Sequence, residues 1–202
     1  MKILVNGFDG KVGSVLCPAL EAAGHTLVTT ESEADVMVDF TAPDVAVPDI
    51  LRALDAGVPC VVGTSGWDIT AVDEPAKKAG LPVFFAPNFA IGAVLGMRFA
   101  EEASKYMERA AIVELHHETK LDAPSGTAIA TAGKMNGDVS IHSVRLPGLI
   151  AHQEVLLGGR GEVLTIRHDA TSREAYVPGV LLALEKITSL PPGVTVGLDK
   201  IL

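Results

Sequence analysis

Residues that could transfer protons and bind anions gather in the stretch Glu114–Ala128, which reads ELHHETKLDAPSGTA. His116 and His117 are adjacent, and histidine titrates near neutral pH and can pass a proton. Lys120 adds a positive charge that can also donate a proton. The segment Ser125-Gly126-Thr127 predicts a helix start whose backbone N–H groups would hold a carboxylate. The stretch therefore predicts a site that handles an anionic substrate.

The alternative interpretation is a histidine pair at a sheet end, a solvated lysine and an ordinary capped helix. Because the histidine pair, the lysine and the helix start occur together in one short stretch, we favour the functional interpretation. In a regular strand, His116 and Lys120 would share one face and His117 would occupy the other. For all three to meet one ligand, the chain must bend after His116.

A second candidate site is the glycine-rich segment GFDGKVG, in which Gly7, Gly10 and Gly13 follow an expected strand and open an expected helix. Glycines there allow a tight turn and close approach of the backbone to a pyrophosphate, which the helix N-terminus attracts. The spacing is GxxGxxG rather than the commoner GxGxxG, and such glycines also occur where a helix only packs on a sheet. The position directly after the first strand favours dinucleotide binding.

Two further loops follow expected parallel strands. They are Gly63-Thr64-Ser65-Gly66 and Ala86-Pro87-Asn88-Phe89. Open α/β sheets bind ligands at the carboxyl ends of their strands, and small residues there leave room for a nicotinamide. Each loop alone could equally be an ordinary connection.

The choice between NADH and NADPH stays open. The nearest acidic candidate for binding the adenine ribose is Glu31. No Arg or Lys lies between Val28 and Asp49 to hold a 2′-phosphate, although Lys11 in the glycine loop could reach one.

Short apolar runs alternate with helical patterns in the first half, which is typical of βαβ units and a parallel sheet. Strands are expected at Lys2–Asn6, Leu27–Thr30, Val36–Phe40, Cys60–Val62 and Val83–Phe85. A helix is expected over about Val12–Ala23, and Thr41-Ala42-Pro43 resembles a helix start with Thr41 as its cap. Only Glu31–Asp35 joins the second and third strands, whereas a parallel crossover usually needs about a dozen residues or more. An abbreviated sheet edge is therefore expected.

The second half has strand-like runs with few helical patterns, which indicates a more antiparallel sheet with few covering helices. We place a domain change near Asn88–Gly92, and a last helix (about Val177–Lys186) and strand (Thr195–Gly197) could return to the first domain. The expected fold class is α/β, with a Rossmann-like parallel-sheet cofactor domain and an α+β domain for substrate binding and oligomerisation. The expected domains are residues 1–89 completed by 177–202, and residues 90–176.

Composition narrows the class of protein. The chain has 202 residues, 48% of them apolar, and a formal net charge of −9. It therefore lacks the basic field that nucleic acid or an anionic membrane requires. Cys17 and Cys60 lie in apolar contexts without metal-ligand spacing, so we expect reduced thiols and no metal site. With no expected signal peptide or membrane span, the interpretation is a cytoplasmic protein without nucleic-acid or membrane partners.

The stretch ELHHETKLDAPSGTA closely resembles the signature of the dihydrodipicolinate reductases, also called 4-hydroxy-tetrahydrodipicolinate reductases, of the diaminopimelate–lysine pathway. GFDGKVG, VDFTAPD, VVGTSGW, APNFAIGAVL, VRLPGLIAHQEV and GEVLTIRHDATSRE occur in the family's order. APNFAIGAVL, GLIAHQEV and LTIRHD look most like the actinobacterial branch. The resemblance covers nearly the whole chain. It implies a homotetramer that moves hydride from NADH or NADPH to C4 of a cyclic dicarboxylate, with loss of water, giving tetrahydrodipicolinate.

The resemblance also implies roles for individual residues. His116 matches the proton donor and acceptor, and Lys120 the proton donor. His117, Gly126 and Thr127 match substrate contacts, the last two holding a carboxylate through backbone N–H groups. The positions that match cofactor contacts are Gly7, Phe8, Asp9, Gly10, Lys11, Val12, Gly63, Thr64, Ser65, Ala86, Pro87, Asn88 and Phe89.

The chain departs from the family by being short at Glu31–Asp35 and at Gly133–Val139. The first deletion shortens the region expected to contact the adenine ribose. The second deletion shortens the domain expected to form the oligomer. Trp67 stands where Phe is usual. Two alternatives remain, namely a related imine or keto-acid reductase and a nucleotide-binding sensor without turnover. His116 and Lys120 disfavour the sensor, which has no need of a proton donor.

Overall fold

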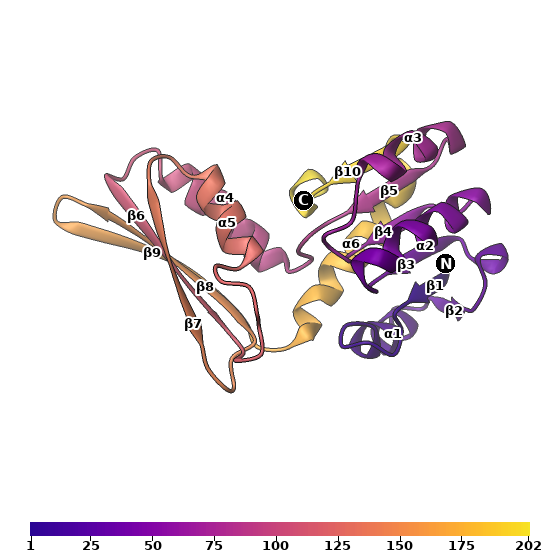
Figure 1. The fold of residues 1–202 in the computed structure, drawn as a ribbon, viewed down its shortest axis with the longest axis horizontal. Helices are drawn as coiled ribbons and strands as arrows, with labels where there is room; N and C mark the ends of the chain where they lie inside the picture. Colours follow the sequence, from indigo (N-terminus) through magenta and orange to yellow (C-terminus); the bar gives the residue numbers. More distant parts are fainter. The chain divides into compact units, whose positions relative to one another are not determined.

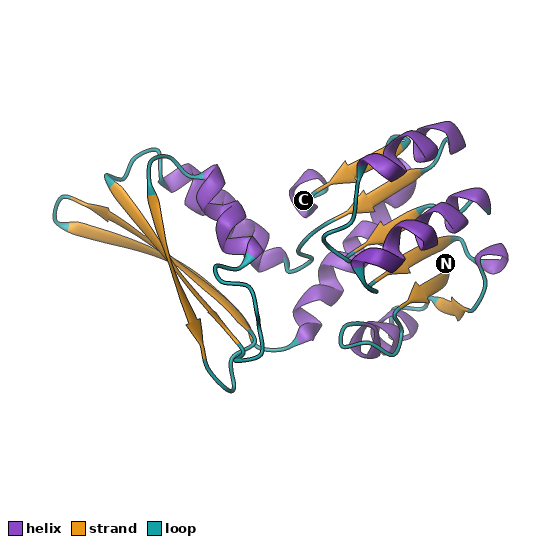
Figure 2. Ribbon diagram, viewed as in Figure 1, coloured by secondary structure: helices purple, strands orange, loops and turns teal.

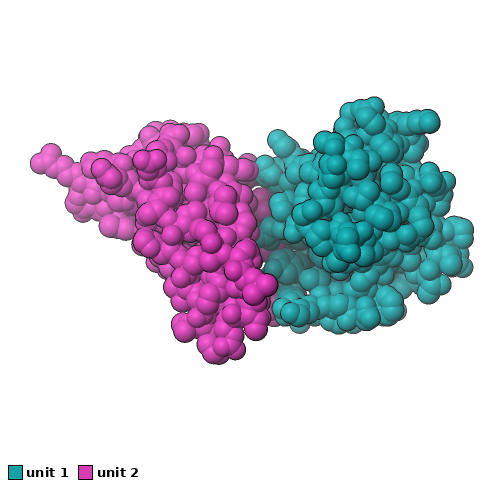
Figure 3. Space-filling view, viewed as in Figure 1, with its two compact units in different colours: residues 1–89, 173–202 teal, residues 90–172 magenta.

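The computed structural model describes residues 1–202, which divide into two units. Unit 1 comprises Met1–Phe89 and Arg173–Leu202, and unit 2 comprises Ala90–Ser172; Figure 3 gives each its own colour. The return to unit 1 begins at Arg173, slightly before the expected Val177, because the short 3₁₀ helix η2 (Arg173–Tyr176) leads into the last helix. No helix combines the length and the hydropathy that crossing a membrane requires.

Unit 1 is built on a parallel six-stranded sheet with the strand order β10-β5-β4-β3-β1-β2 (Figure 1). Its strands are β1 (Lys2–Asn6), β2 (Thr26–Val28), β3 (Val36–Asp39), β4 (Cys60–Val62), β5 (Pro82–Phe85) and β10 (Gly193–Val196). Because the chain moves outward from β1 to β2 and then returns to β3 on the other side of β1, the strand order reverses between β1 and β3. This reversal is the topological switch point at which doubly wound sheets bind ligands.

Helices cover both faces of this sheet. They are α1 (Gly13–Ala22), α2 (Pro43–Asp55), α3 (Thr70–Ala79) and α6 (Val177–Lys186). Leu4, Met37 and Val62 share one face and pack into a core with Ile50 of α2 and Val72 of α3. The alternate strand residues point to the opposite face, on which α1 and α6 contact β1 and β4. The central strands β3, β4 and β5 are rich in Val and Phe because they are buried on both sides.

The expected short edge is present, and its geometry explains how so few residues connect two parallel strands. Val28, the last residue of β2, is level with Leu4 of β1, and Val36, the first residue of β3, is level with Ile3. The chain therefore needs almost no return along the strand direction. A single 3₁₀ turn, η1 (Glu31–Glu33), makes the connection.

Thr41 does not cap α2. The N-cap is Ala42, with no side-chain hydrogen bond, and the Thr41 hydroxyl instead donates to Asp39 of β3. Pro43 stands in the first turn of α2, as expected, where its missing N–H costs nothing.

Unit 2 has a mixed four-stranded sheet with the order β7-β6-β8-β9 (Figure 2). Its elements are α4 (Ile91–Ala103), β6 (Arg109–His116), α5 (Gly126–Lys134), β7 (Val139–Arg145), β8 (Ala151–Gly159) and β9 (Glu162–Ala170). β6 and β7 are parallel with α5 as their crossover, and β8 and β9 add antiparallel pairs. The remaining short 3₁₀ helices of the chain are η2 (Arg173–Tyr176), η3 (Ile187–Ser189) and η4 (Leu198–Lys200).

Helices α4 and α5 cover one face of this sheet. Ile112 of β6 and Val155 of β8 are cross-strand neighbours, and both are buried against Ala100 of α4 and Ala128 of α5. Glu114 and His116 follow Ile112 at intervals of two residues, so they lie on this same helix-covered face. The fold thus places the conspicuous histidine at the end of a strand and on the sheltered side of its sheet.

Candidate active site

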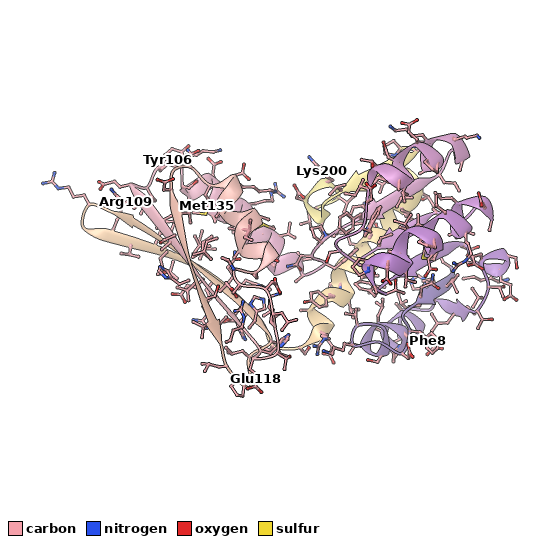
Figure 4. All side chains as sticks on the ribbon, viewed as in Figure 1. Phe8, Tyr106, Arg109, Glu118, Met135 and Lys200 are labelled. Atoms are coloured by element: carbon pink, nitrogen blue, oxygen red, sulfur yellow. The ribbon has the colours of Figure 1, made fainter.

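The glycines of the loop after β1 allow its backbone to pack tightly against neighbouring backbone. Gly7 has φ +80°, and a Cβ atom on it would lie 2.3 Å from the carbonyl oxygen of Phe40. A Cβ atom on Gly13 would lie 2.1 Å from the carbonyl oxygen of Gly7, and the Gly10 N–H donates to that same oxygen at 3.0 Å. A side chain at Gly7 or Gly13 would therefore clash with neighbouring backbone. Phe8 is 66% exposed at the loop surface (Figure 4).

The loops after β3 and β4 are joined by a buried carboxylate. Asp39 is fully buried and accepts hydrogen bonds from the hydroxyls of Thr41 and Thr64, at 3.0 and 2.5 Å. Burial raises the pKa of Asp39, against the effect of these hydrogen bonds. The Thr64 hydroxyl also accepts from the Thr41 N–H at 2.7 Å, and the Thr64 carbonyl accepts from the Trp67 indole at 2.8 Å. The Thr64 side chain is therefore engaged within the protein, while Ser65 is exposed.

The loop after β5 begins with a buried segment. The Ala86 N–H donates to the Val62 carbonyl, which carries the pairing of β4 and β5 one step beyond the strands. Phe89 is 2% exposed, and its ring packs against Phe40 and Phe84 with centroid separations of 5.7 and 6.1 Å. Its side chain therefore belongs to the core of unit 1. Pro87 is the exposed member of this segment.

A cavity of about 380 Å³ lies beside the glycine loop, lined by residues of β1 and β2 together with Phe8 and Cys17. Glu31, the nearest acidic candidate for the ribose, is turned toward α2, where its carboxylate accepts from Arg52 Nε at 3.3 Å. Arg52 also donates to Asp49 at 2.6 Å, and Asp49 accepts from the Asn6 amide at 3.0 Å. The short link is thus anchored to α2 through its carboxylate.

In unit 2 the strand β6 ends at His116, so the chain leaves the sheet at the predicted bend. A turn follows directly, in which the Lys120 N–H donates to the His117 carbonyl at 3.1 Å. Glu118 lies beyond this end of the strand, at the opposite end of the sheet from Arg109 (Figure 4). The His117 ring hydrogen-bonds the Thr119 hydroxyl at 2.8 Å.

The imidazole of His116 forms a hydrogen bond with the fully buried carboxylate of Glu114. His116 Nδ1 lies 2.5 Å from Glu114 Oε2. Arg145, the last residue of β7, donates to both oxygens of Glu114 at 2.8 Å, and the Ser125 N–H donates to Oε1 at 3.2 Å. Burial raises the pKa of Glu114, but hydrogen bonds from Arg145, Ser143 and His116 outweigh it and lower the pKa to about 2. Glu114 is therefore an anion at neutral pH.

Several influences act on the pKa of His116. Burial is the largest and lowers the pKa, the hydrogen bond and charge of Glu114 raise it, and the positive charges of Lys120 and Arg145 lower it. The net shift is downward, so the ring exchanges its proton at a pH below that of ordinary histidine. Lys120 Nζ pairs with Asp122 Oδ1 at 2.8 Å, and this pairing lowers the pKa of Asp122.

The start of α5 lies next to this group. Ser125 is the N-cap and its hydroxyl accepts from the Ala128 N–H at 3.2 Å. Gly126 and Thr127 occupy the first helical positions, where backbone N–H groups point out of the helix end and the helix dipole is positive. Nothing lies within 4 Å of a Cβ atom built on Gly126, so the approach to this helix end is open.

Sequence reasoning found His116, Lys120 and the α5 start but gave no role to Glu114 or Arg145. A signal for Glu114 was present, because a residue two positions before a histidine on a strand shares its face. The sequence carried no such signal for Arg145, because only the parallel pairing of β6 and β7 places Arg145 opposite His116.

The doubly wound parallel sheet with its glycine loop, and the second unit with a carboxylate-bonded histidine beside a lysine, define a class of two-unit nicotinamide-dependent reductases. Two family models match the chain: "Dihydrodipicolinate reductase, N-terminus" over residues 24–89 and "Dihydrodipicolinate reductase, C-terminus" over residues 92–202. The chain belongs to the dihydrodipicolinate reductase family. It is an NAD(P)H-dependent oxidoreductase of the diaminopimelate and lysine pathway.

Individual relatives agree with the family models. The 4-hydroxy-tetrahydrodipicolinate reductase of Mycolicibacterium smegmatis is 45% identical over 243 aligned positions, which cover 100% of this chain and 99% of that protein. The reductase of the same name from Nocardia farcinica is 43% identical, with 100% and 98% covered. Because this chain has 202 residues, part of each alignment consists of gaps in it.

Solved structures support the same fold. A dipicolinate-bound dihydrodipicolinate reductase from Paenisporosarcina sp. TG-14 superposes with a TM-score of 0.84 at 29% identity, covering 100% of this chain and 99% of that one. An amine dehydrogenase from Mycobacterium smegmatis, at 10% identity and a TM-score of 0.69, shares the fold alone.

Proposed function

We propose that the chain reduces 4-hydroxy-tetrahydrodipicolinate to tetrahydrodipicolinate, with His116 and Lys120 supplying the proton. A hydride and a proton enter the substrate, and its hydroxyl leaves as water. The observation that carries the proposal is the pairing of His116 with buried Glu114 beside Lys120. A sensor that does not turn over would have no use for a histidine held in this way.

The chemistry of the substrate fits unit 2. A cyclic dicarboxylate brings two negative charges, which need N–H donors and cations. The first-turn N–H groups of Gly126 and Thr127 would hold one carboxylate, and His117 would contact the substrate as well. Lys120 would donate a proton where electron density appears on the ring after hydride arrival. His116 would accept or donate a proton through the ring nitrogen that does not face Glu114.

The residues of unit 1 fit a dinucleotide. Gly7 and Gly13 keep the turn tight, because a Cβ atom on either would clash with the protein backbone at 2.3 or 2.1 Å. The turn lies before the N-terminus of α1, which favours a pyrophosphate. The bound nicotinamide would supply the hydride. The positions proposed to contact the cofactor are Gly7, Phe8, Asp9, Gly10, Lys11, Val12, Gly63, Thr64, Ser65, Ala86, Pro87, Asn88 and Phe89, with Thr64 and Phe89 acting through their backbone.

We propose that the site takes NADH or NADPH, and two side chains bear on the choice between them. The Glu31 carboxylate accepts a hydrogen bond from Arg52. Lys11 is separated from acidic Asp9 by a single glycine in the sequence. Titrating each nucleotide against the protein, with Lys11→Ala as the variant, measures the preference. A selective loss of NADPH affinity in Lys11→Ala would assign the 2′-phosphate to this lysine.

We also propose a homotetramer in the cytoplasm, where the nicotinamide pool and the pathway's other substrates are present. The sheet face of unit 2 that points away from α4 and α5 carries Leu115, Leu156 and Val163, the last 69% exposed. These apolar side chains lie on the same face as the Arg167–Glu154 ion pair, and their exposure favours burial against another copy. Light scattering after gel filtration gives the mass, and Leu156→Glu is expected to reduce it.

A coupled assay tests the activity. The preceding synthase condenses pyruvate with aspartate semialdehyde, and the loss of reduced-nicotinamide absorbance is followed with NADH or NADPH. Consumption is expected to require the synthase and to vanish in Lys120→Ala, while the exposed Lys105→Ala control retains it. Unchanged consumption in a folded Lys120→Ala protein would overturn the proposed role, and faster reduction of a linear imine or keto acid would replace the substrate.

A further inference from the structure

We infer that Glu114 is a positioning residue that fixes the ring of His116 so that Nε2 alone exchanges the proton. This inference rests on the proposed function, because it assigns Glu114 a part in the proton transfer of His116. It concerns a side chain that is itself enclosed, since Glu114 is 0% exposed and has no path to a ligand of its own.

The hydrogen bonds determine which ring nitrogen carries the proton. An ionised carboxylate can only accept hydrogen bonds. Arg145 donates to both of its oxygens and the Ser125 N–H donates to one, so Glu114 stays ionised at neutral pH. His116 Nδ1, at 2.5 Å from Glu114 Oε2, must therefore carry the hydrogen of that bond. Nε2 is left as the nitrogen that gains and loses a proton.

The position of Glu114 on the strand fixes the direction of the ring. Glu114 and His116 are on the same face of β6, and Arg145 is the β7 residue that pairs with His116. The guanidinium spans the two neighbouring strands and holds the carboxylate with two nearly equal bonds of 2.8 Å. A bidentate pair of this kind restricts orientation as well as adding energy. The carboxylate therefore has one fixed place from which to hold the ring.

The same carboxylate is also tied to the start of α5. Its Oε1 accepts the N–H of Ser125, the N-cap of that helix. One buried group thus contacts both the proposed proton donor and the helix end proposed to bind a substrate carboxylate. Loss of the Glu114 charge should affect both proton transfer and substrate affinity, but should leave nicotinamide affinity in unit 1 unchanged.

The competing interpretation is that Glu114 and Arg145 form an ion pair that only stabilises the sheet. In that case the tautomer of His116 would not depend on Glu114. Nitrogen-15 NMR of the imidazoles distinguishes the two interpretations without reference to activity, and His116→Gln assigns the signals. We expect neutral His116 in the unmodified chain to carry its proton on Nδ1. A proton on Nε2 would overturn the inference without any Glu114 variant.

The variant Glu114→Gln tests the coupling directly. Without the anionic neighbour, the pKa of His116 is expected to fall by about 1 unit or more, and the Nδ1–H form should lose its dominance. The matched control is Glu118→Gln, which removes the same charge from an exposed position beyond the end of β6. An unchanged pKa and tautomer in folded Glu114→Gln would overturn the inference.

Kinetics complete the test. In Glu114→Gln we expect kcat to fall by roughly 10- to 100-fold, which is part of the about 10²- to 10⁴-fold that a positioned general acid contributes. We expect KM for the cyclic substrate to rise while KM for the nicotinamide stays constant. Because a general acid must be protonated to act, the limb of the kcat–pH profile on which kcat falls as the pH rises through the pKa of His116 should move to lower pH with the NMR value. If Glu114 fixes the tautomer but His116→Gln keeps full activity, then His116 does not transfer the proton. The role of Glu114 in orienting the His116 ring would still hold.

Discussion

Thr64 and Asp39 are joined by a hydrogen bond of 2.5 Å, in which the threonine hydroxyl donates to a carboxylate that is fully buried. The same hydroxyl accepts from the backbone N–H of Thr41. One side chain therefore links the loops after β3 and β4, next to the switch point of the sheet.

This relationship predicts different outcomes for two substitutions at position 64. Thr64→Val keeps the shape but removes the hydroxyl, so buried Asp39 loses its shortest hydrogen bond and the Thr41 N–H keeps only its 3.3 Å bond to Asp39. The expected cost in the free energy of unfolding is about 1–3 kcal/mol, with weaker binding of the nicotinamide cofactor. Thr64→Ser keeps the hydroxyl and should stay close to the unmodified protein. Urea unfolding and nucleotide titration measure both effects, and equal behaviour of the two variants would contradict the linking role.

The loop around Thr64 also shows where sequence reasoning reached its limit. Small residues after predicted strands were enough to place Gly63-Thr64-Ser65 at the ligand-binding edge. They could not show that the hydroxyl of Thr64 is used inside the protein, because Asp39 lies on another strand. Thr41 was expected to cap α2 for its residue type alone, but Asp39 is close in the fold and takes its hydroxyl instead.

Elements with strong periodicity were predicted well because their pattern is local. The β1–α1 unit follows from a short apolar run, a glycine turn and a helical pattern. By contrast, the role of Glu31 depended on where a shortened edge would place it, and the ion pair with Arg52 required the position of α2. Arg145 likewise required knowing that β7 runs parallel to β6.

The glycine turn predicts a sharp contrast between two Gly→Ala substitutions. At Gly13 an added Cβ atom would lie 2.1 Å from the Gly7 carbonyl oxygen, so the loop must open. We expect Gly13→Ala to lose unfolding free energy by several kcal/mol or to fail to bind nucleotide. Gly133 in α5 has nothing within 4 Å of its Cβ position. There Gly133→Ala should stabilise the protein by up to about 1 kcal/mol through helix propensity. Thermal unfolding compares the two, and a harmless Gly13→Ala would contradict the closed turn.

The low pKa of Glu114 predicts how stability changes with acid. A carboxylate with a folded-state pKa of about 2, below its ordinary value of 4.5, contributes stability that is fully present above 4.5. That contribution is lost as the pH falls from 4.5 through 2, and the shift corresponds to roughly 3 kcal/mol. The difference in unfolding free energy between the unmodified chain and Glu114→Gln should therefore shrink over this range. Denaturant unfolding at a series of pH values measures it, and a constant difference would show that the pKa of Glu114 is not lowered in the folded protein.

The ion pairs of Arg52 hold the short link between β2 and β3 against α2, and this predicts a loss of stability when Arg52 is removed. Its guanidinium bridges Glu31 of η1 and Asp49 of α2, whose side chain is 9% exposed. In Arg52→Ala the Asp49 carboxylate keeps only the amide of Asn6, so we expect a loss of about 1–3 kcal/mol of unfolding free energy. The control is Lys77→Ala, which breaks the exposed pairs of Lys77 with Asp73 and Glu74. Exposed pairs of this kind contribute about 0–1 kcal/mol. Urea unfolding ranks the two variants, and a cost for Arg52→Ala no greater than that for Lys77→Ala would mean that the link is held by β2 and β3 alone.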